Sequence, residues 1–341
     1  MRAAVFEGPG NVRVQDVPDA TIELSTDALV RVTHAGICGD DLWAYRGYGA
    51  RVPGQRIGHE FIGVVEGVGS DVSTVKPGDV VVSPFVWSDG VCDYCRGGLQ
   101  TSCEDGGVWG EPGSDGAQGE AVRVPYADGT LVIVPKSLHG AETRVLPLAD
   151  VMSTGHHAAV AGGVNGGSRV AVIGDGAVGL CAVMAARRLG AARVLILGHH
   201  SERLKVAWEF GATDVVSGRG DEGIEEVMAL TGGVDVVLEC VGAQGAFDTA
   251  FAMVRDGGTI GYVGVPHAVD GIDLGRLFGR NIGIRGGVAP ARAYIPTLLT
   301  DVVNGTLNAS PVFDLAVHLE DVSAGYQAMD SRSALKVLVK P

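Results

Sequence analysis

The sequence predicts an α/β protein in which a β-barrel-like domain is joined to a domain with a doubly wound parallel sheet. Three observations lead to this prediction. The chain has 341 residues, its first part is rich in short β-branched runs, and its second part alternates strand-like with helix-like segments. Domains usually contain roughly 100 to 200 residues, so two domains are expected. A hydrophobic share of 46% against a charged share of 19% predicts globular domains with large cores.

The first predicted domain covers residues 1–150. Its short runs of Val and Ile are interrupted by Gly, Pro and Asp, which is typical of a compact β domain with functional loops. These runs are ALVRVTHAG, FIGVVEGVG, DVVVSPF and LVIVPKS.

The second predicted domain covers residues 151–288, where strands and helices alternate. The strand-like runs are RVAVI, RVLIL, TDVVS, VDVVLEC, GTIGYVG and NIGIRGG, and the helix-like segments between them are AVGLCAVMAARRLG, SERLKVAWEFG and AFDTAFAMVRDGG. This alternation indicates right-handed βαβ units. Residues 289–341 contain a helix around AYIPTLLTDVVNG and a final strand in KVLVKP. They are too few for a separate domain and are expected to complete the first one.

A glycine-rich loop follows the strand RVAVI and opens the next helix, as in Rossmann dinucleotide-binding domains. It consists of Gly174, Asp175, Gly176, Ala177, Val178 and Gly179. Gly174 permits the tight turn, Gly176 lets the backbone approach a pyrophosphate, and Gly179 lets helix and strand pack closely. The helix N-terminus offers N–H groups to phosphate. An ordinary glycine-rich turn is the alternative, but the five strands that follow favour a nicotinamide cofactor.

The end of the second strand indicates which nicotinamide cofactor binds. NAD-dependent enzymes usually carry Asp or Glu there, to bind the ribose 2′-hydroxyl. Here RVLIL is followed by Gly198, His199 and His200, with Arg203 three residues on. Gly198 is expected to leave room for a 2′-phosphate, and the other three offer donors or positive charge. NADP is therefore predicted over NAD; the alternative is that these are solvated loop residues and NAD binds less selectively.

Candidate metal ligands are scattered along the first domain. Cys38 lies in GICGDD, His59 and Glu60 begin the stretch GHEFIGVVEGVGSDV, and Asp150 ends LPLAD. Each alone fits a structural role: a buried thiol, a core histidine or a helix cap. Together with the downstream fold, they make the chain resemble the medium-chain zinc-dependent alcohol dehydrogenase family over essentially its whole length.

The resemblance implies a GroES-like catalytic domain with a catalytic zinc. Cys38, His59 and Asp150 would be ligands of this zinc, and Glu60 a further ligand or a nearby carboxylate that exchanges with water. Thiolate, imidazole and carboxylate suit zinc and leave a position for the substrate oxygen. Zinc there would lower the pKa of an alcohol or polarise a carbonyl.

A second candidate zinc site lies in one short loop. It consists of Asp89, Cys92, Cys95 and Cys103. Relatives usually have four cysteines here, but a carboxylate is also an accepted zinc ligand. A site closed by four protein ligands would be structural. The alternative is a mobile loop with three reduced cysteines.

Two departures from the family pattern affect the route by which the proton of an alcohol substrate would leave the site. Asp40 stands where relatives have Ser or Thr, and Trp43 stands near a position that is often His. Asp40 could accept the alcohol proton as a general base, or point to solvent while Asp41 holds the loop.

Further site residues follow from position or resemblance. Phe85, Trp43, Trp87 and Trp109 are candidates for the substrate pocket, which would favour apolar or aromatic substrates if two of these rings face the zinc. Thr154 resembles the threonine that contacts nicotinamide, and Val241, Val263 and Val288 are candidates for the cleft floor.

The predicted function is therefore a zinc-dependent oxidoreductase that moves a hydride between NADP and an alcohol, aldehyde or ketone. The alternatives are an NAD-dependent polyol or sugar dehydrogenase and, from another class, a non-catalytic NADPH-binding protein. A net charge of −14 makes nucleic acid an unfavourable partner. With no leader-like start and no long apolar run, a cytoplasmic protein without membrane contact is expected. The resemblance implies a homodimer or homotetramer.

Overall fold

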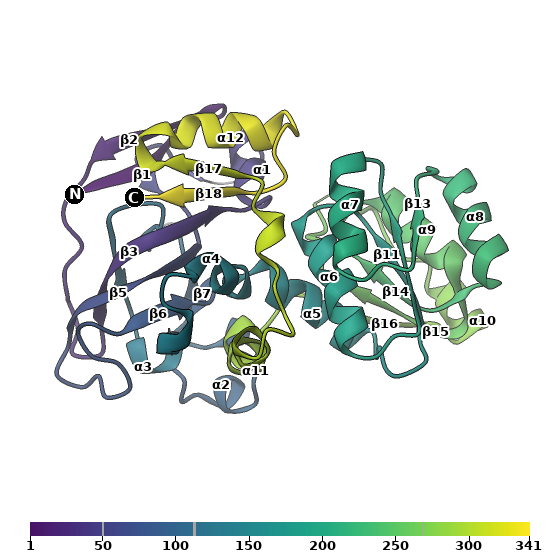
Figure 1. The fold of residues 1–341 in the computed structure, drawn as a ribbon, viewed down its shortest axis with the longest axis horizontal. Coiled ribbons are helices and arrows are strands. Elements are labelled where there is room, and N and C mark those ends of the chain that lie inside the picture. The colour runs from purple at the N-terminus through teal and green to yellow at the C-terminus, as the bar shows by residue number, and fades with distance from the viewer. Residues whose placement is uncertain (50, 112–113, 268) are drawn as a thin grey trace. The chain divides into compact units, whose positions relative to one another are not determined.

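The computed structural model describes residues 1–49, 51–111, 114–267 and 269–341. The chain divides into two compact units (Figure 1). Unit 1 consists of Met1–Asp150 together with Pro290–Pro341, and unit 2 consists of Val151–Ala289.

The main sheet of unit 1 has the order β10-β6-β5-β3-β18-β17, with β9 also paired to β3. Its strands are β3 (Ala28–Ile37), β5 (Glu60–Val68), β6 (Val80–Ser83), β9 (Ala121–Val124), β10 (Val132–Ile133), β17 (Leu315–His318) and β18 (Val337–Lys340). β3 pairs antiparallel with both β5 and β18. These strands are rich in β-branched residues and bury side chains such as Val30, Val65 and Val337 in one core.

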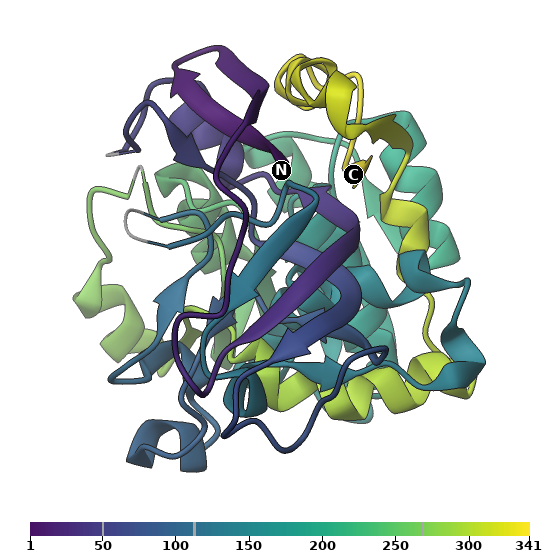
Figure 2. The same ribbon diagram turned by 90° about the vertical axis from the view of Figure 1, so that its left-hand side faces the viewer.

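Smaller sheets and short helices complete unit 1. The sheets are β2-β1-β4 and β7-β8, formed by β1 (Arg2–Gly8), β2 (Asn11–Asp16), β4 (Gln55–Arg56), β7 (Val86–Trp87) and β8 (Gly107–Val108). The helices are α1 (Asp41–Tyr45), α2 (Asp93–Arg96), α3 (Ala127–Thr130), α4 (Glu142–Val145), α11 (Ala291–Val303) and α12 (Val322–Asp330). The C-terminal helix α12 lies beside the N-terminal strand β2, and Figure 2 shows this yellow segment close to the purple strands.

Unit 2 contains a six-stranded parallel sheet with the order β13-β12-β11-β14-β15-β16. The strands are β11 (Arg169–Ile173), β12 (Arg193–Leu197), β13 (Asp214–Val216), β14 (Val234–Glu239), β15 (Val254–Tyr262) and β16 (Gly283–Gly286). The winding direction reverses between β11 and β14, which is where such sheets bind ligands. This topology confirms the predicted doubly wound sheet.

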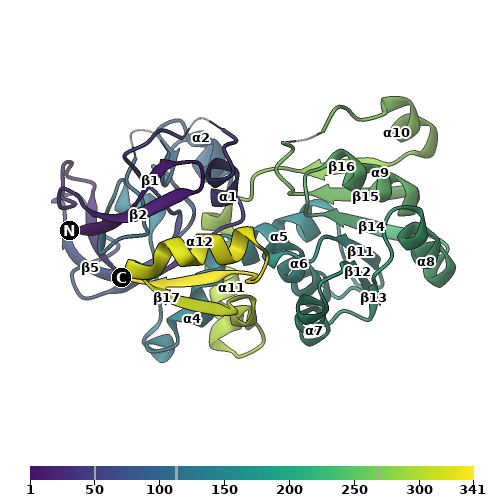
Figure 3. The same ribbon diagram turned by 90° about the horizontal axis from the view of Figure 1, so that it is seen from above.

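Helices cover both faces of this sheet. They are α5 (Val151–Ala161), α6 (Ala177–Arg188), α7 (Ser201–Glu209), α8 (Asp221–Thr231), α9 (Gln244–Met253) and α10 (Leu274–Arg280). α5, α6 and α7 follow one another on one face, whereas α8 and α9 pack together on the other (Figure 3). The central strands are therefore buried along almost their whole length. None of the described helices is long and apolar enough to cross a lipid bilayer.

The sequence pattern misplaced one helix end. The segment AFDTAFAMVRDGG was expected to be helical throughout, but α9 ends at Met253 and β15 begins at Val254. Val254 pairs with Val234 of β14. Pairing with a neighbouring strand thus overrides the local helical pattern.

Candidate functional site

Four buried side chains converge in unit 1, namely Cys38, His59, Glu60 and Asp150, here called the Cys38 cluster. Each offers one ligand atom, and these atoms all lie within 4.8 Å of one another. Sγ of Cys38 lies 3.1 Å, and Nε2 of His59 3.3 Å, from Oδ2 of Asp150. Ligand atoms around tetrahedral zinc, with bonds of about 2.0–2.3 Å, lie roughly 3–4 Å apart. The donor set and its spacing therefore fit zinc.

Two neighbouring strands and two glycines position this cluster. Cys38 directly follows β3 and Glu60 begins β5, and Gly36 of β3 pairs with Glu60. A Cβ at Gly36 would run into Oε2 of Glu60, so this glycine leaves the carboxylate its space. Gly58, next to His59, has φ +97°, and a Cβ there would collide with the side chain of Gln118. Gly36 and Gly58 thus leave the space that the ligand side chains and their neighbours need.

Burial and neighbouring charges shift the pKa values of the cluster residues. Burial raises the pKa of the Cys38 thiol, and the neighbouring Asp150 raises it further. Burial also acts to raise the pKa of Asp150, but the hydrogen bond and charge of His59 hold it well below its ordinary value. A divalent cation bound among these groups would replace the proton of Cys38 and favour the thiolate.

A chain of buried polar groups lies behind His59. Oδ1 of Asp41 lies 3.6 Å from Nδ1 of His59, while Oδ2 accepts hydrogen bonds from the backbone N–H of Cys38 (3.1 Å) and from Nε2 of Gln118 (3.3 Å). The Tyr326 hydroxyl donates to Oε1 of Gln118 (2.9 Å). A carboxylate behind the second ring nitrogen orients a ligating imidazole. The sequence suggested a loop-holding role for Asp41, but no pattern pointed to Gln118 or Tyr326.

A buried lysine, Lys336, also contacts a residue of the cluster, and no sequence pattern pointed to it. Nζ of Lys336 lies 2.6 Å from Oε1 of Glu60, and the side chains are 1% and 0% exposed. Lys336 directly precedes β18, and only the pairing of β18 with β3 brings it here.

The residues that set the predicted proton route lie at the start of α1. Asp40 is exposed and directly precedes this helix, and Trp43 is half-buried within it. The ring of Trp43 lies edge-on to Tyr48, with centroids 5.5 Å apart.

Of the other candidate pocket aromatics, only Phe85 is placed against a cluster residue in the described structure. Its ring centroid lies 6.4 Å from that of His59. Trp109 is 1% exposed and packs on Trp87, with ring centroids 5.0 Å apart, within the core of unit 1. Trp109 therefore fills the core of unit 1 and does not line a pocket, whereas Trp87 is half-buried and its place in the pocket stays a prediction.

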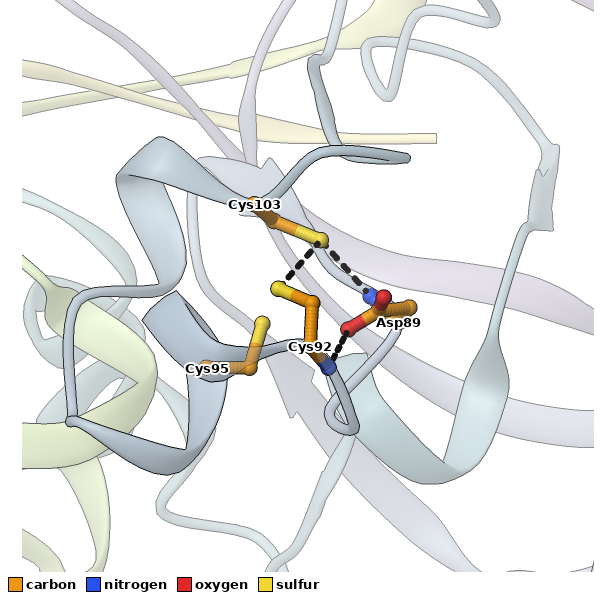
Figure 4. A group of neighbouring side chains, drawn as sticks. All are labelled: Asp89, Cys92, Cys95 and Cys103. Atoms are coloured by element: carbon orange, nitrogen blue, oxygen red, sulfur yellow. Dashed lines mark hydrogen bonds between the residues drawn. The ribbon is translucent and has the colours of Figure 1, made fainter.

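The second cluster consists of Asp89, Cys92, Cys95 and Cys103, and is here called the Cys103 cluster. Its four side chains point toward one another (Figure 4), and their ligand atoms lie within 4.8 Å. Sγ of Cys92 and Sγ of Cys103 are 3.9 Å apart. Partial burial opposes ionisation of Asp89, but the backbone N–H groups of Cys92 and Val91 help to lower its pKa to about 2. An ionised carboxylate with three thiols fits a tetrahedral zinc.

The glycine-rich loop of unit 2 has the geometry of a phosphate-binding turn. Gly174 has φ +109°, and α6 begins at Ala177 with Gly176 as its N-cap. Among the described residues, no atom lies within 4 Å of the place that a Cβ at Gly176 would take. A Cβ at Gly179, by contrast, would collide with the carbonyl oxygen of Gly174. The loop is thus open where a pyrophosphate would approach and tight where helix and strand pack.

The tip of β12 differs from the expectation for Gly198. A Cβ at Gly198 would lie 2.5 Å from Cβ of Asp175, so the space beside this glycine is occupied by Asp175 and is not left open for a phosphate. Oδ2 of Asp175 accepts hydrogen bonds from the backbone N–H groups of His199 (2.8 Å) and His200 (3.0 Å) and lies 2.9 Å from Nδ1 of His200. Arg203 lies 3.9 Å from Oδ1. The structure therefore brings these residues together around a carboxylate.

The remaining cofactor candidates of unit 2 lie on α5 or after strands β14, β15 and β16. Thr154 is half-buried in α5, Val241 follows β14, Val263 follows β15, and Val288 is 63% exposed after β16. Glu239 holds two of them, because its Oε1 accepts from the N–H of Val241 (2.7 Å) and its carbonyl oxygen accepts from the N–H of Val263 (2.9 Å).

Two family models match the chain. The model described as alcohol dehydrogenase GroES-like domain matches residues 25–136, and the model described as zinc-binding dehydrogenase matches residues 177–304. The barrel-like part of unit 1 is therefore the predicted GroES-like domain.

Individual relatives match along the whole chain. A zinc-type alcohol dehydrogenase-like protein of Bacillus subtilis is 33% identical over 100% of both chains. The solved alcohol dehydrogenase TADH from Thermus sp. ATN1 is 37% identical, with a TM-score of 0.94 over 100% of both chains. A zinc-binding dehydrogenase from Sinorhizobium meliloti, solved with NADP bound, is 28% identical, with a TM-score of 0.84 over 100% of this chain and 99% of that one.

Proposed function

Because the chain belongs to the zinc-dependent medium-chain alcohol dehydrogenase family, we propose that it transfers a hydride between NADP and an alcohol, aldehyde or ketone. The observation that carries this proposal is the Cys38 cluster, where a thiol, an imidazole and carboxylates converge. Zinc held there would supply Lewis-acid polarisation of the substrate oxygen. A non-catalytic NADPH-binding protein would have no need of these buried ligands.

Different residues of the chain have different roles in the proposed reaction. In the proposal Cys38, His59 and Asp150 hold the metal, and Asp41 orients the imidazole of His59. Asp40, exposed and two positions after Cys38, either accepts the alcohol proton as a general base or faces solvent while Asp41 holds the loop through the N–H of Cys38. The Cys103 cluster holds a second, structural zinc that stabilises its loop.

A substrate and cofactor panel tests the reaction. We expect the zinc-loaded protein to oxidise NADPH in the presence of aldehydes or ketones, and faster than it oxidises NADH. Faster oxidation of polyols with NAD would support a polyol dehydrogenase instead. Zinc-loaded protein that binds NADPH but turns over no member of the panel would contradict the enzymatic proposal.

The proposed preference for NADP rests on the cationic Arg203 and on the hydrogen-bond donors of the turn after β12. Arg203, His199 and His200 gather there, and the Sinorhizobium relative was solved with NADP. Asp175 already accepts hydrogen bonds from the turn, so its negative charge is partly compensated.

Arg203→Ala is expected to weaken NADPH binding roughly tenfold or more and to leave NADH binding nearly unchanged. The reason is that a hydrogen bond to a charged group contributes about 1.5–3 kcal/mol. Fluorescence titration of both cofactors measures the effect. Lys205→Ala, on the same helix and paired with Glu202, is the matched control. Equal weakening of both cofactors by Arg203→Ala would contradict a role in phosphate recognition.

We further propose that the chain forms a homodimer or homotetramer through the edge of its parallel sheet. β16 is the last strand of this sheet, and α10, which packs beside β15, carries Leu274 and Phe278 with exposures of 73% and 88%. Open strand edges and exposed large apolar residues favour association. Phe278→Asp is expected to reduce the mass found by light scattering to that of one chain. A native protein that is already monomeric at micromolar concentration would contradict this proposal.

A further inference from the structure

The ion pair between Lys336 and Glu60 lies beside the Cys38 cluster and is fully enclosed. Besides its 2.6 Å contact with Oε1 of Glu60, Nζ of Lys336 donates to the carbonyl oxygen of Ile37 (3.2 Å). It also lies 5.6 Å from the ring centroid of Phe313. Lys336 belongs to the C-terminal segment, and these contacts hold its side chain close to Cys38.

The two oxygens of Glu60 have different surroundings. Oε1 is held by Lys336, whereas Oε2 is buried and receives no hydrogen bond from any described residue. Oε2 also lies against Gly36, where a side chain would collide with it. Glu60 nevertheless offers one oxygen to the group of ligand atoms within 4.8 Å. Its carboxylate therefore has two competing positive partners when a metal is bound: Lys336 and the metal.

Removal of one partner should drive the carboxylate to the other. A buried carboxylate without a compensating charge is strongly unfavourable. Catalytic zinc sites have three protein ligands and an open position, whereas structural sites are closed by four. If Glu60 became a permanent ligand beside Cys38, His59 and Asp150, the open position would be lost.

We propose that Lys336 is a positioning residue that holds Glu60 back from the metal and thereby keeps one coordination position open for the substrate oxygen. This inference rests on the proposed function, because it requires a metal in the Cys38 cluster. It gives the C-terminal segment a specific part in the chemistry of a site whose ligands all lie in the first 150 residues.

The test compares K336M, K336R and the double variant K336M/E60Q with the native protein. K336M removes the charge at similar length, K336R keeps the charge, and the double variant removes both charges. Two measurements do not depend on turnover. One is the rate at which a chelator removes zinc from the Cys38 cluster, and the other is the change that azide causes in the visible spectrum of the Co²⁺-substituted protein.

K336M is expected to release this zinc more slowly than the native protein and to lose the spectral response to azide, while turnover falls about 10–100-fold. K336R should retain the response to azide, and K336M/E60Q should recover it. Circular dichroism and thermal unfolding verify that the variants fold.

A merely structural ion pair would give the opposite metal result. If K336M released zinc as fast as the native protein or faster, or if it still bound azide, the inference would be wrong even though the proposed function stood. Native protein without zinc in the Cys38 cluster would instead overturn the proposed function, and elemental analysis of the native protein distinguishes these two failures.

Discussion

Cys38→Ser is expected to leave one zinc ion per chain instead of the two that the two clusters would hold, and to abolish most of the activity. Serine replaces a thiolate, the softest ligand of the Cys38 cluster, with a hydroxyl that binds zinc poorly. Loss of the metal removes several kcal/mol of stabilisation of the transition state, on the order of a thousandfold or more in rate. Elemental analysis and the aldehyde assay with NADPH measure both effects.

Cys103→Ser is the matched control, because it removes a cysteine from the other cluster. It should also leave one zinc ion per chain, but the remaining ion should be the one held by Cys38. Activity at low temperature should largely remain, whereas the unfolding temperature should fall because the loop loses its cross-link. If Cys103→Ser abolished activity and Cys38→Ser did not, the proposed roles of the two clusters would be reversed.

Gly179→Ala is expected to destabilise unit 2 and to weaken cofactor binding at least tenfold. A Cβ at this position would collide with the carbonyl oxygen of Gly174. The obstacle is backbone, so the loop and α6 must separate, and overpacking of this kind costs about 1–3 kcal/mol. Thermal unfolding and fluorescence titration with NADPH measure the two effects.

Gly176→Ala provides a contrast within the same motif. Its φ of −75° suits any residue, and no described atom lies within 4 Å of the added Cβ. We therefore expect an unchanged unfolding temperature together with weaker NADPH binding, because the methyl group would occupy the approach to the pyrophosphate. Full NADPH affinity in Gly176→Ala would show that the loop does not bind this part of the cofactor.

The sequence by itself predicted the elements that repeat or follow a local pattern. The six strands of unit 2 were recognisable because a parallel sheet covered on both faces leaves continuous apolar runs between helices. The glycine-rich loop was recognisable because its three glycines have the spacing that a tight turn between a strand and a helix requires. The residues of both clusters were also named in advance, from loop spacing in one case and from the family resemblance in the other, and the structure brings each set together.

Only the tertiary structure decided which other residues surround these sites. Lys336 and Glu60 are 276 positions apart, and Tyr326 and Gln118 are 208 apart. No period or local spacing links such residues, because the contacts exist only after β18 has paired with β3 and α12 has packed beside β2 and β18. The neighbour of Gly198 was likewise not predictable from the sequence. The absence of a side chain at Gly198 indicated space beside it, but not that Asp175 would occupy this space. A local pattern encodes the path of the backbone, whereas side-chain neighbours across a sheet depend on how distant strands pair and pack.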